Sequence, residues 1–222
     1  MPKKLPTSRL VLVDDHALVR EGLAEAIKRE PDLAICGEAE TALEARQIIE
    51  LTRPDLVIVD LALRKSDGLD LIKDLHLQHP DLLMLVVSMH DEALFAERAL
   101  RNGARGYITK HEASHTVLQA IRRVLAGEIY LSEEMAAQIA AQVVGQSRPS
   151  KGLAVEALSD RELQVFRLIG QGRSSREIAA ELHLDPSTID TYRARLKEKL
   201  GLESTSELLR SAIAWTHGST SA

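Results

Sequence analysis

The first 130 residues alternate between short apolar runs and longer amphipathic stretches. The apolar runs lie at 9–13, 33–39, 55–60, 82–88 and 106–109. Between and after them, apolar residues recur with a helical period near 17–30, 41–51, 68–79, 92–102 and 113–126. Near-continuous apolar strands that alternate with helices are typical of a parallel sheet covered on both faces. The pattern therefore predicts an α/β domain with a five-stranded, parallel, doubly wound sheet at residues 8–128.

The pattern changes in the last third of the chain. Residues 131–144 have the periodicity of one more helix, and residues 145–152 are rich in Gly, Ser and Pro, as linkers are. No strand-like run appears after residue 155. We therefore expect a helix and a flexible linker at 129–153, and an all-α domain at 154–217.

Three helix starts in this second domain can be recognised from their caps. Ser159 and Ser174 each stand three residues before a glutamate, which is the spacing of a capping box. An aspartate precedes Pro186, which suits the first helical position because an N–H there would have no partner. The helices expected at 175–182 and 186–200 are thus separated by a short turn. That arrangement is typical of a helix-turn-helix, whose second helix enters the major groove of DNA.

Composition limits the class of protein. Hydrophobic residues make up 45% and charged residues 27%, which is the balance of an ordinary soluble globular protein. No apolar run approaches the roughly 20 residues that span a bilayer, and the N-terminus has no secretory signal, so we expect no membrane association. Cys36 is the only cysteine, which excludes an internal disulfide and fits the reducing cytoplasm.

Bulk charge does not indicate nucleic-acid binding in the second domain. The net charge of −5 lies within residues 1–150, whereas residues 151–222 carry equal numbers of basic and acidic side chains. Four basic residues do cluster between 193 and 199. A solvated amphipathic helix would also carry such a cluster, but the short turn and the paired caps favour a DNA-binding helix.

Carboxylates follow two of the predicted strands. Asp14 and Asp15 come directly after the first strand, and Asp60 ends the third. In a flavodoxin-like sheet with strand order 2-1-3-4-5 these strands are neighbours, so their carboxyl ends meet at one edge. A cluster of three carboxylates is unfavourable when empty and favourable around Mg²⁺, which prefers oxygen ligands. Each aspartate taken alone could instead cap a helix or turn.

Two further polar residues end strands of the same sheet. Ser88 ends the fourth strand and Lys110 follows the fifth. Each alone would be an ordinary strand-end residue. A hydroxyl and an ammonium that converge on the acidic edge, however, suit the binding and neutralisation of phosphoryl oxygens.

Residues 8–128 resemble the receiver domain of two-component response regulators. The resemblance rests on the motifs "VDDH", "VDLALRKSDGLD", "VVSMHDE" and "GARGYITK", which stand in the family's order. It implies that Asp60 is the phosphoacceptor, with a partner sensor histidine kinase as the phosphoryl donor. It further implies that Asp15 binds Mg²⁺ directly, Asp14 binds it through water, and the backbone carbonyl of Ala62 is a further ligand.

The same resemblance assigns the remaining receiver residues. Ser88 and Lys110 would hold the acyl phosphate, and Tyr107 would be the aromatic that changes rotamer with phosphorylation. The chain departs from the family after the phosphoacceptor, where Leu63 and Arg64 replace the usual Met and Pro. Leu for Met is nearly isosteric, whereas Arg for Pro removes a turn constraint and adds a cation, which puts the phosphate lifetime in doubt.

Residues 156–215 resemble the LuxR/FixJ-type helix-turn-helix, including its motifs "REIA", "TID" and "KLG". Carried over by position, Asp190, Thr191 and Ala194 stand where the family contacts base edges. Contacts to DNA phosphates are expected from Tyr192, Arg193, Arg195, Lys197 and Lys199. Many members have Lys at the position of Asp190. A carboxylate there could accept a hydrogen bond from cytosine N4. The operator sequence therefore cannot be carried over from the family. The last helix, 204–215, resembles the family's dimerisation helix, although its apolar residues could equally close the core.

Together these features predict a NarL/FixJ-type response regulator, a transcription factor whose DNA binding is controlled by phosphorylation of Asp60. We expect it to bind double-stranded DNA as a homodimer. An alternative is a phosphorylation-independent regulator with a vestigial receiver. A metabolic enzyme is disfavoured, because Ala62 stands where hydrolases of this chemistry commonly place a second Asp, and no Gly-rich phosphate loop follows the first strand.

Overall fold

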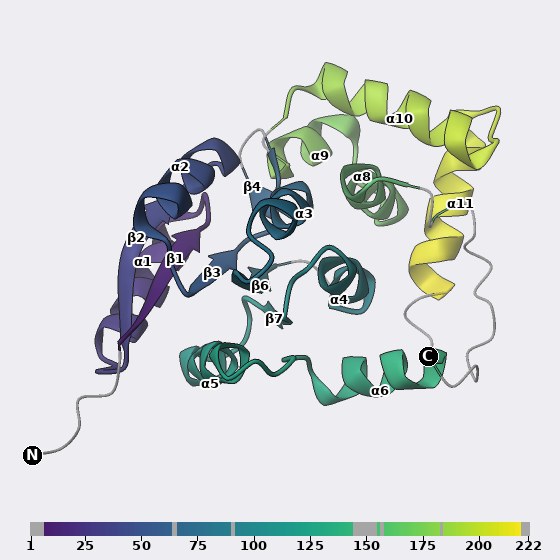
Figure 1. The fold of residues 1–222 in the computed structure, drawn as a ribbon. Coiled ribbons are helices and arrows are strands. Elements are labelled where there is room, and N and C mark those ends of the chain that lie inside the picture. Colours follow the sequence, from purple (N-terminus) through teal and green to yellow (C-terminus); the bar gives the residue numbers. More distant parts are fainter. Residues whose placement is uncertain are drawn as a thin grey trace, which may run out of the picture. The chain divides into compact units, whose positions relative to one another are not determined.

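A computed structural model describes residues 7–63, 66–89, 92–143, 155, 158–182 and 184–218. The chain forms two compact units, Met1–Gln146 and Ser147–Ala222. The first is an α/β unit and the second is helical (Figure 1). The linker predicted at 145–152 lies outside the described residues. In the described ranges, no helix is long and apolar enough to cross a membrane.

The sheet of the first unit has five parallel strands in the order β2-β1-β3-β6-β7. These strands are β1 (Ser8–Val13), β2 (Leu33–Ala39), β3 (Leu56–Val59), β6 (Leu83–Ser88) and β7 (Gly106–Thr109). This is the predicted 2-1-3-4-5 order, and each strand agrees with its apolar run to within a residue at either end. The chain reverses its direction of winding between β1 and β3, so their carboxyl ends form the switch point at which α/β sheets bind ligands.

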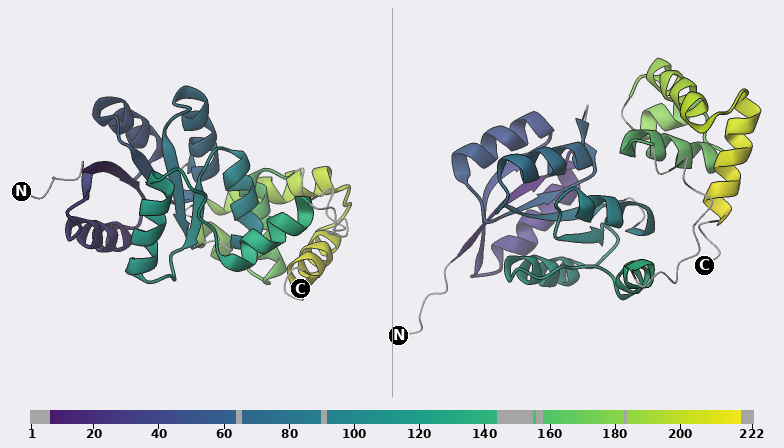
Figure 2. Two further views of the ribbon diagram at one scale, coloured as in Figure 1. Left: turned by 60° about the horizontal axis from the view of Figure 1, so that its bottom comes forward. Right: turned by 45° about the vertical axis from the view of Figure 1, so that its right-hand side comes forward.

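Helices cover both faces of this sheet (Figures 1 and 2). One face carries α1 (Ala17–Lys28) and α5 (Ser114–Leu125), and the other carries α2 (Ala42–Thr52), α3 (Gly68–Gln78) and α4 (Glu92–Arg101). Because side chains of a strand alternate, Leu10 and Leu12 join the core beneath α1 and α5, with Ile27 and Ile121 from those helices. The neighbouring Val11 is buried on the opposite face. The predicted doubly wound fold is confirmed.

A short antiparallel hairpin was not predicted. It consists of β4 (Ala62–Leu63) and β5 (Ser66–Asp67), which pair directly after Asp60. Strands of two residues show no periodicity, so the apolar pattern does not reveal them. The hairpin delivers Asp67 to the N-cap of α3, where its side chain accepts from the backbone N–H of Leu69.

Gly68 lies at the closest approach between α3 and the strand that carries Asp60. A Cβ at this position would lie 2.2 Å from the Asp60 carbonyl oxygen and 2.6 Å from Leu61 Cα. Both neighbours are backbone atoms and cannot move aside as a flexible side chain would. The start of α3 therefore packs directly against the strand end at which Asp60 stands.

The second unit is all helical, as predicted. Its helices are α8 (Asp160–Gly170), α9 (Ser175–Glu181), α10 (Pro186–Leu200) and α11 (Thr205–Gly218), while α6 (Glu133–Val143) belongs to the first unit. Both predicted capping boxes are present, at Ser159 and at Ser174. A left-handed Gly201 ends α10. Leu208 on α11 is buried, and the Trp215 ring packs against Phe166 with their centroids 5.7 Å apart, so α11 closes the core of this unit.

Candidate functional site

The three predicted carboxylates meet at the carboxyl ends of β1 and β3. Asp14, Asp15 and Asp60 are only 4%, 5% and 2% exposed. The two strands are adjacent, and the Asp60 N–H donates to the Val13 carbonyl across them at 2.8 Å. Burying three carboxylates together is costly unless cations compensate them. The positive groups around these side chains therefore determine whether the three carboxylates can stay buried together.

Lys110 supplies one such positive group. Its Nζ lies 2.6 Å from Asp60 Oδ2 and 2.6 Å from Asp14 Oδ2, and its side chain is 2% exposed. Its backbone N–H donates to the Ser88 carbonyl at 2.8 Å, because β6 and β7 are neighbours. Ser88 is fully buried at the end of β6. The structure thus brings together the carboxylates and the ammonium group, and it places Ser88 beside Lys110 at the end of the neighbouring strand.

His16 is a member of this cluster to which the sequence analysis assigned no role. Its Nδ1 lies 2.8 Å from Asp15 Oδ1, 3.3 Å from Asp14 Oδ1 and 3.9 Å from Asp60 Oδ2. The side chain is 47% exposed, so it forms the outer wall of the site. Its adjacency to the two aspartates was the only signal in the sequence, and such adjacency does not say where a side chain points.

Arg20 supports the loop that carries these residues. Its Nη1 donates to the Asp14 carbonyl oxygen at 2.6 Å, and its other nitrogens pair with Glu38 at 3.2 Å and with Glu40 at 2.9 Å. Its side chain is only 13% exposed. Arg20 therefore fixes the backbone after β1 to the end of β2. This residue, too, was missed, because the partners are about twenty positions away in the sequence.

The donor set fits a hard divalent cation. One ligand atom from each of Asp14, Asp15, His16 and Asp60 can be chosen such that all lie within 4.8 Å of one another. An octahedral ion with bonds of about 2.1 Å has opposite ligands about 4.2 Å apart, so small side-chain movements would bring these atoms onto one ion. The ammonium group of Lys110 compensates part of the negative charge of these carboxylates.

The remaining receiver residues surround this cluster. The Ala62 N–H donates to Asp60 Oδ1 at 3.2 Å. Leu63, which stands where the family usually has Met, is 2% exposed and therefore belongs to the core. Arg64 lies outside the described residues. Tyr107 is fully buried on the face of the sheet that α4 covers.

The candidate DNA-binding residues lie along α10. Asp190, Thr191, Ala194 and Arg195 are exposed, and Ser175 at the start of α9 donates to Asp190 Oδ1 at 3.2 Å. The half-exposed residues of the predicted set are Tyr192, Arg193 and Lys197. Within the described residues, Arg195 and Lys197 form no ion pair with a carboxylate, so their charges are available to a DNA backbone.

Lys199 differs from the other basic residues of α10. Its Nζ lies 2.7 Å from Glu162 Oε2, and the Glu162 side chain is 4% exposed. Burial acts to raise the pKa of Glu162, but the hydrogen bonds from Lys199 and from Ser159 outweigh it and hold that pKa below its usual value. This side chain therefore joins α10 to α8, and its charge is already engaged.

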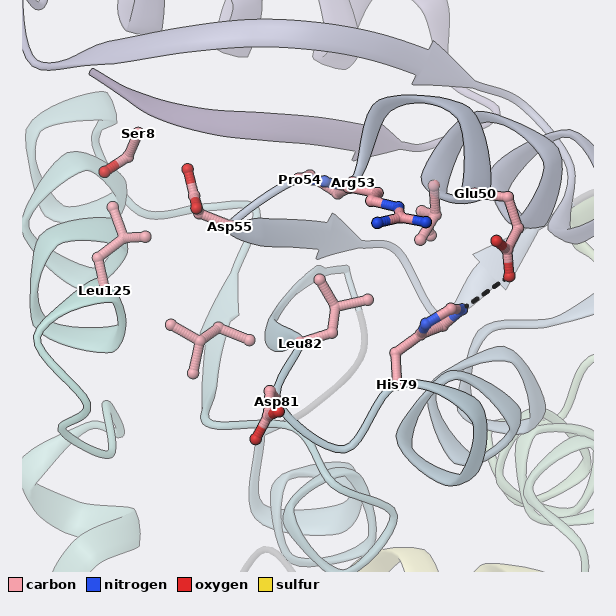
Figure 3. Close-up of a pocket in the computed structure, with 11 residues that line it drawn as sticks. Ser8, Glu50, Arg53, Pro54, Asp55, His79, Asp81, Leu82 and Leu125 are labelled. Atoms are coloured by element: carbon pink, nitrogen blue, oxygen red, sulfur yellow. Dashed lines mark ion pairs between the residues drawn. The ribbon is translucent and has the colours of Figure 1, made fainter. Parts of the chain in front are cut away.

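A cavity of about 620 Å³ lies at the amino ends of the strands, opposite the acidic cluster at their carboxyl ends (Figure 3). Its walls come from residues at the amino ends of strands, such as Ser8, Asp55 and Leu82, and from the end of α2. His79 and Glu50 form an ion pair of 3.2 Å across its rim (Figure 3). None of the predicted site residues lines it. The acidic cluster, rather than this cavity, is the candidate site.

Comparison with known proteins agrees with both halves of the structure. The family model described as "Response regulator receiver domain" matches residues 10–122, and that described as "Bacterial regulatory proteins, luxR family" matches residues 156–212. The chain belongs to the NarL/FixJ family of response regulators. This response regulator is therefore a transcriptional regulator of a two-component system, and not a metabolic enzyme.

Relatives of similar length match almost the whole response regulator. "Response regulator GacA" of Pseudomonas protegens is 35% identical and covers 95% of this chain and 96% of its own length. "Oxygen regulatory protein NreC" of Staphylococcus carnosus is 31% identical over 92% of this chain and 96% of its own. The similarity to these regulators therefore extends over both units of the chain.

Solved structures agree at the level of the fold. A LuxR-family response regulator from Aurantimonas is 37% identical with a TM-score of 0.58, and it covers 62% of this chain and 99% of its own. RcsB from Salmonella enterica, solved "bound to promoter P1flhDC in the presence of phosphomimetic BeF3-", is 22% identical with a TM-score of 0.60 over 93% of this chain and 98% of its own. At that identity, RcsB supports the fold of the response regulator alone.

Proposed function

We propose that this response regulator is a transcription factor whose sequence-specific DNA binding is controlled by phosphorylation of Asp60 by a partner histidine kinase in the cytoplasm. The observation that carries the proposal is the buried Asp60 carboxylate, held at a strand end between Lys110 and two further aspartates. One oxygen of this carboxylate would attack phosphorus once a cation offsets the surrounding negative charge. The bond from phosphorus to the donor atom breaks, and its electron pair leaves with the donor.

Mg²⁺ would be held by Asp15, by Asp60, by Asp14 through water and by the Ala62 carbonyl, and it supplies charge neutralisation for the phosphoryl oxygens. Lys110, released from one of its two carboxylates, would hold one oxygen of the acyl phosphate, and the Ser88 hydroxyl would hold another. The rest of the receiver would sense this exchange of partners at Lys110 and Ser88, with Tyr107 as the aromatic that changes rotamer.

The output would be the binding of α10 in the major groove of an operator. Asp190, Thr191 and Ala194 would contact base edges, while Tyr192, Arg193, Arg195 and Lys197 would contact phosphates. The predicted set also contains Lys199, which is the weakest member because it already pairs with Glu162. A homodimer would bind the two halves of the operator. In this proposal residues 8–128 form the receiver domain, residues 129–153 a helix and linker, and residues 154–217 the DNA-binding domain.

Phosphorylation can be tested by intact-mass spectrometry. Incubation with acetyl phosphate and Mg²⁺ should add one phosphoryl group, because the small donor needs only the nucleophile and the cation. The Asp60→Asn variant should show no adduct, whereas Asp55→Asn, which changes an aspartate at the opposite edge of the sheet, should behave as the unaltered protein. An adduct that survives in Asp60→Asn would remove Asp60 from the proposed role.

A second candidate function is a regulator that binds DNA independently of phosphorylation. It is favoured by Leu63 and Arg64, which stand where related receivers carry Met and Pro. No adduct in the unaltered protein, combined with sequence-specific DNA binding, would favour this candidate over the first.

A further inference from the structure

Asp190 stands on the exposed side of α10, close to the start of that helix. Ile189 and Leu196 are buried and define the side of α10 that packs on the rest of the unit, whereas Asp190 and Ala194, one turn later, are exposed. In a helix-turn-helix, side chains near the start of the second helix face the edges of base pairs. The small side chain of Ala194 leaves space for a base pair beside the Asp190 carboxylate.

A hydroxyl group from the neighbouring helix holds this carboxylate. Ser175, the first residue of α9, donates to Asp190 Oδ1 at 3.2 Å. The start of α9 does not need this hydroxyl, because the preceding Ser174 already caps the helix by accepting from the Glu177 N–H. Among the described residues, no group donates to Asp190 Oδ2 and no basic side chain pairs with Asp190. Its second oxygen is therefore available to a donor outside the protein.

A fixed carboxylate on this side of α10 restricts what it can meet on DNA. Phosphates are anionic acceptors and repel it, so its partner must be a hydrogen-bond donor on a base edge. In the major groove the donors are the amino groups of cytosine N4 and adenine N6. Adenine also places its acceptor N7 beside the amino group, which repels a carboxylate, whereas cytosine has no acceptor on this edge. Cytosine is therefore the base that the Asp190 carboxylate favours.

We propose that Ser175 positions Asp190 as a specificity-determining acceptor, so that each operator half-site carries a cytosine at the base pair that faces the start of α10. This proposal rests on the proposed function, since it requires α10 to enter the major groove. Ser175 is a residue to which the sequence analysis assigned no role in DNA binding. Its hydroxyl restricts the rotamers of Asp190, so the carboxylate loses less conformational freedom on binding and turns less readily toward another base.

The first test compares base preferences of the full chain and of Asp190→Asn. The operator is defined by selecting duplexes from a random DNA pool with unaltered protein that has been treated with acetyl phosphate and Mg²⁺. Each base pair is then exchanged in turn, and fluorescence anisotropy measures the affinity. One position in each half-site should require cytosine, with a loss of at least about fivefold for other bases.

In Asp190→Asn the preference at this one position should move from cytosine to adenine, because an amide donates to N7 and accepts from N6. Identical base preferences in Asp190→Asn and the unaltered protein would overturn the proposal.

Ser175→Ala tests the positioning role. The variant should still bind the operator, but its preference for cytosine at the same position should fall by about threefold, while preferences at other positions stay unchanged. The matched control is Ser187→Ala, which removes a hydroxyl that donates to Asp185 and should leave the cytosine preference unaltered. An undiminished preference in Ser175→Ala would overturn the positioning role of Ser175.

A change on the DNA gives an answer that does not depend on the folding of any variant. N4-methylcytosine carries a methyl group in place of the major-groove N–H and still pairs with guanine, so it should weaken operator binding by the unaltered protein by at least about fivefold. Undiminished binding to this duplex would overturn the proposal and leave the proposed function intact. A selection that enriches no sequence would overturn the proposed function together with this inference.

Discussion

At the scale of single residues, the charge balance of the acidic cluster depends on Lys110. Its ammonium contacts two carboxylates within a site that is almost closed to solvent. Breaking a buried ion pair by removing one partner leaves an uncompensated charge, which costs far more than the loss of a surface pair. The lysine thus has a structural role before any phosphoryl group is present.

Replacement of Lys110 by Met should therefore destabilise the first unit by about 3 kcal/mol in EDTA, and Mg²⁺ should restore part of that loss because it compensates the same carboxylates. Urea unfolding followed by circular dichroism would measure both effects. The control is Lys28→Met, which removes an exposed pair with Glu25 and should cost less than about 0.5 kcal/mol. An equal loss for Lys110→Met with and without Mg²⁺ would contradict this explanation.

At the scale of helices and strands, the apolar pattern predicted the five strands and the helices that cover the sheet, the flavodoxin-like fold supplied the strand order, and the spacing of Ser and Glu predicted the capping boxes of the second unit. The pattern worked because each of these elements has enough residues to show its period. It failed for the two-residue strands β4 and β5. It also missed His16 and Arg20, since the direction of a side chain and its distant partners are fixed only by tertiary contacts. The strand-end residues were found because topology, rather than sequence distance, brings them together.

The contact between α8 and α10 yields a prediction about Lys199. Because its partner Glu162 is buried, Lys199→Met should destabilise the second unit by about 1–2 kcal/mol, whereas Lys197→Met should have little effect. The pKa of Glu162 is lowered in the folded chain, so its contribution is present above the usual glutamate value of about 4.3 and is lost as the pH falls through the folded value. Urea unfolding followed by Trp215 fluorescence at neutral and at acidic pH should show the difference between Lys199→Met and the unaltered protein shrink in acid.

Arg195, on the exposed part of α10, should behave differently. Its replacement by Ala is expected to weaken binding to specific and unrelated DNA alike, and to lower the slope of log affinity against log salt by about one. Fluorescence anisotropy with labelled duplexes at several salt concentrations would measure the slope. Arg29→Ala, an equal change of charge on the first unit, should leave the slope unchanged. An unaltered slope for Arg195→Ala would remove this residue from the phosphate contacts.

At the scale of the whole molecule, the acidic cluster and the candidate DNA-binding helix belong to different units. The acidic cluster belongs to the first unit, and the net negative charge lies within residues 1–150. The helix α10 belongs to the second unit, and residues 151–222 carry equal numbers of basic and acidic side chains. Under the proposed function, weak bulk attraction to DNA would leave room for control, because a modest change in dimerisation or in access to α10 would decide whether the operator is bound.

Operator binding should accordingly tighten on phosphorylation. Duplexes selected from a random DNA pool can be titrated with the unaltered protein, with and without acetyl phosphate and Mg²⁺. We expect affinity to increase by about tenfold, the size of a typical coupling free energy, and Asp60→Asn to show no increase. Equal affinities for phosphorylated and unphosphorylated protein, after mass spectrometry has shown the adduct, would favour the phosphorylation-independent candidate.

Gly68 shows that the demands of the acidic cluster extend to a residue with no functional group. Because a Cβ at this position would meet the Asp60 carbonyl oxygen, every other amino acid would displace the strand end on which Asp60 stands. Alanine, which ordinarily strengthens a helix, would do harm here. In a family tree or a mutational screen, position 68 should therefore be as intolerant as position 60, and a survey of chemically active side chains alone would underestimate how much of the sequence is constrained by signalling.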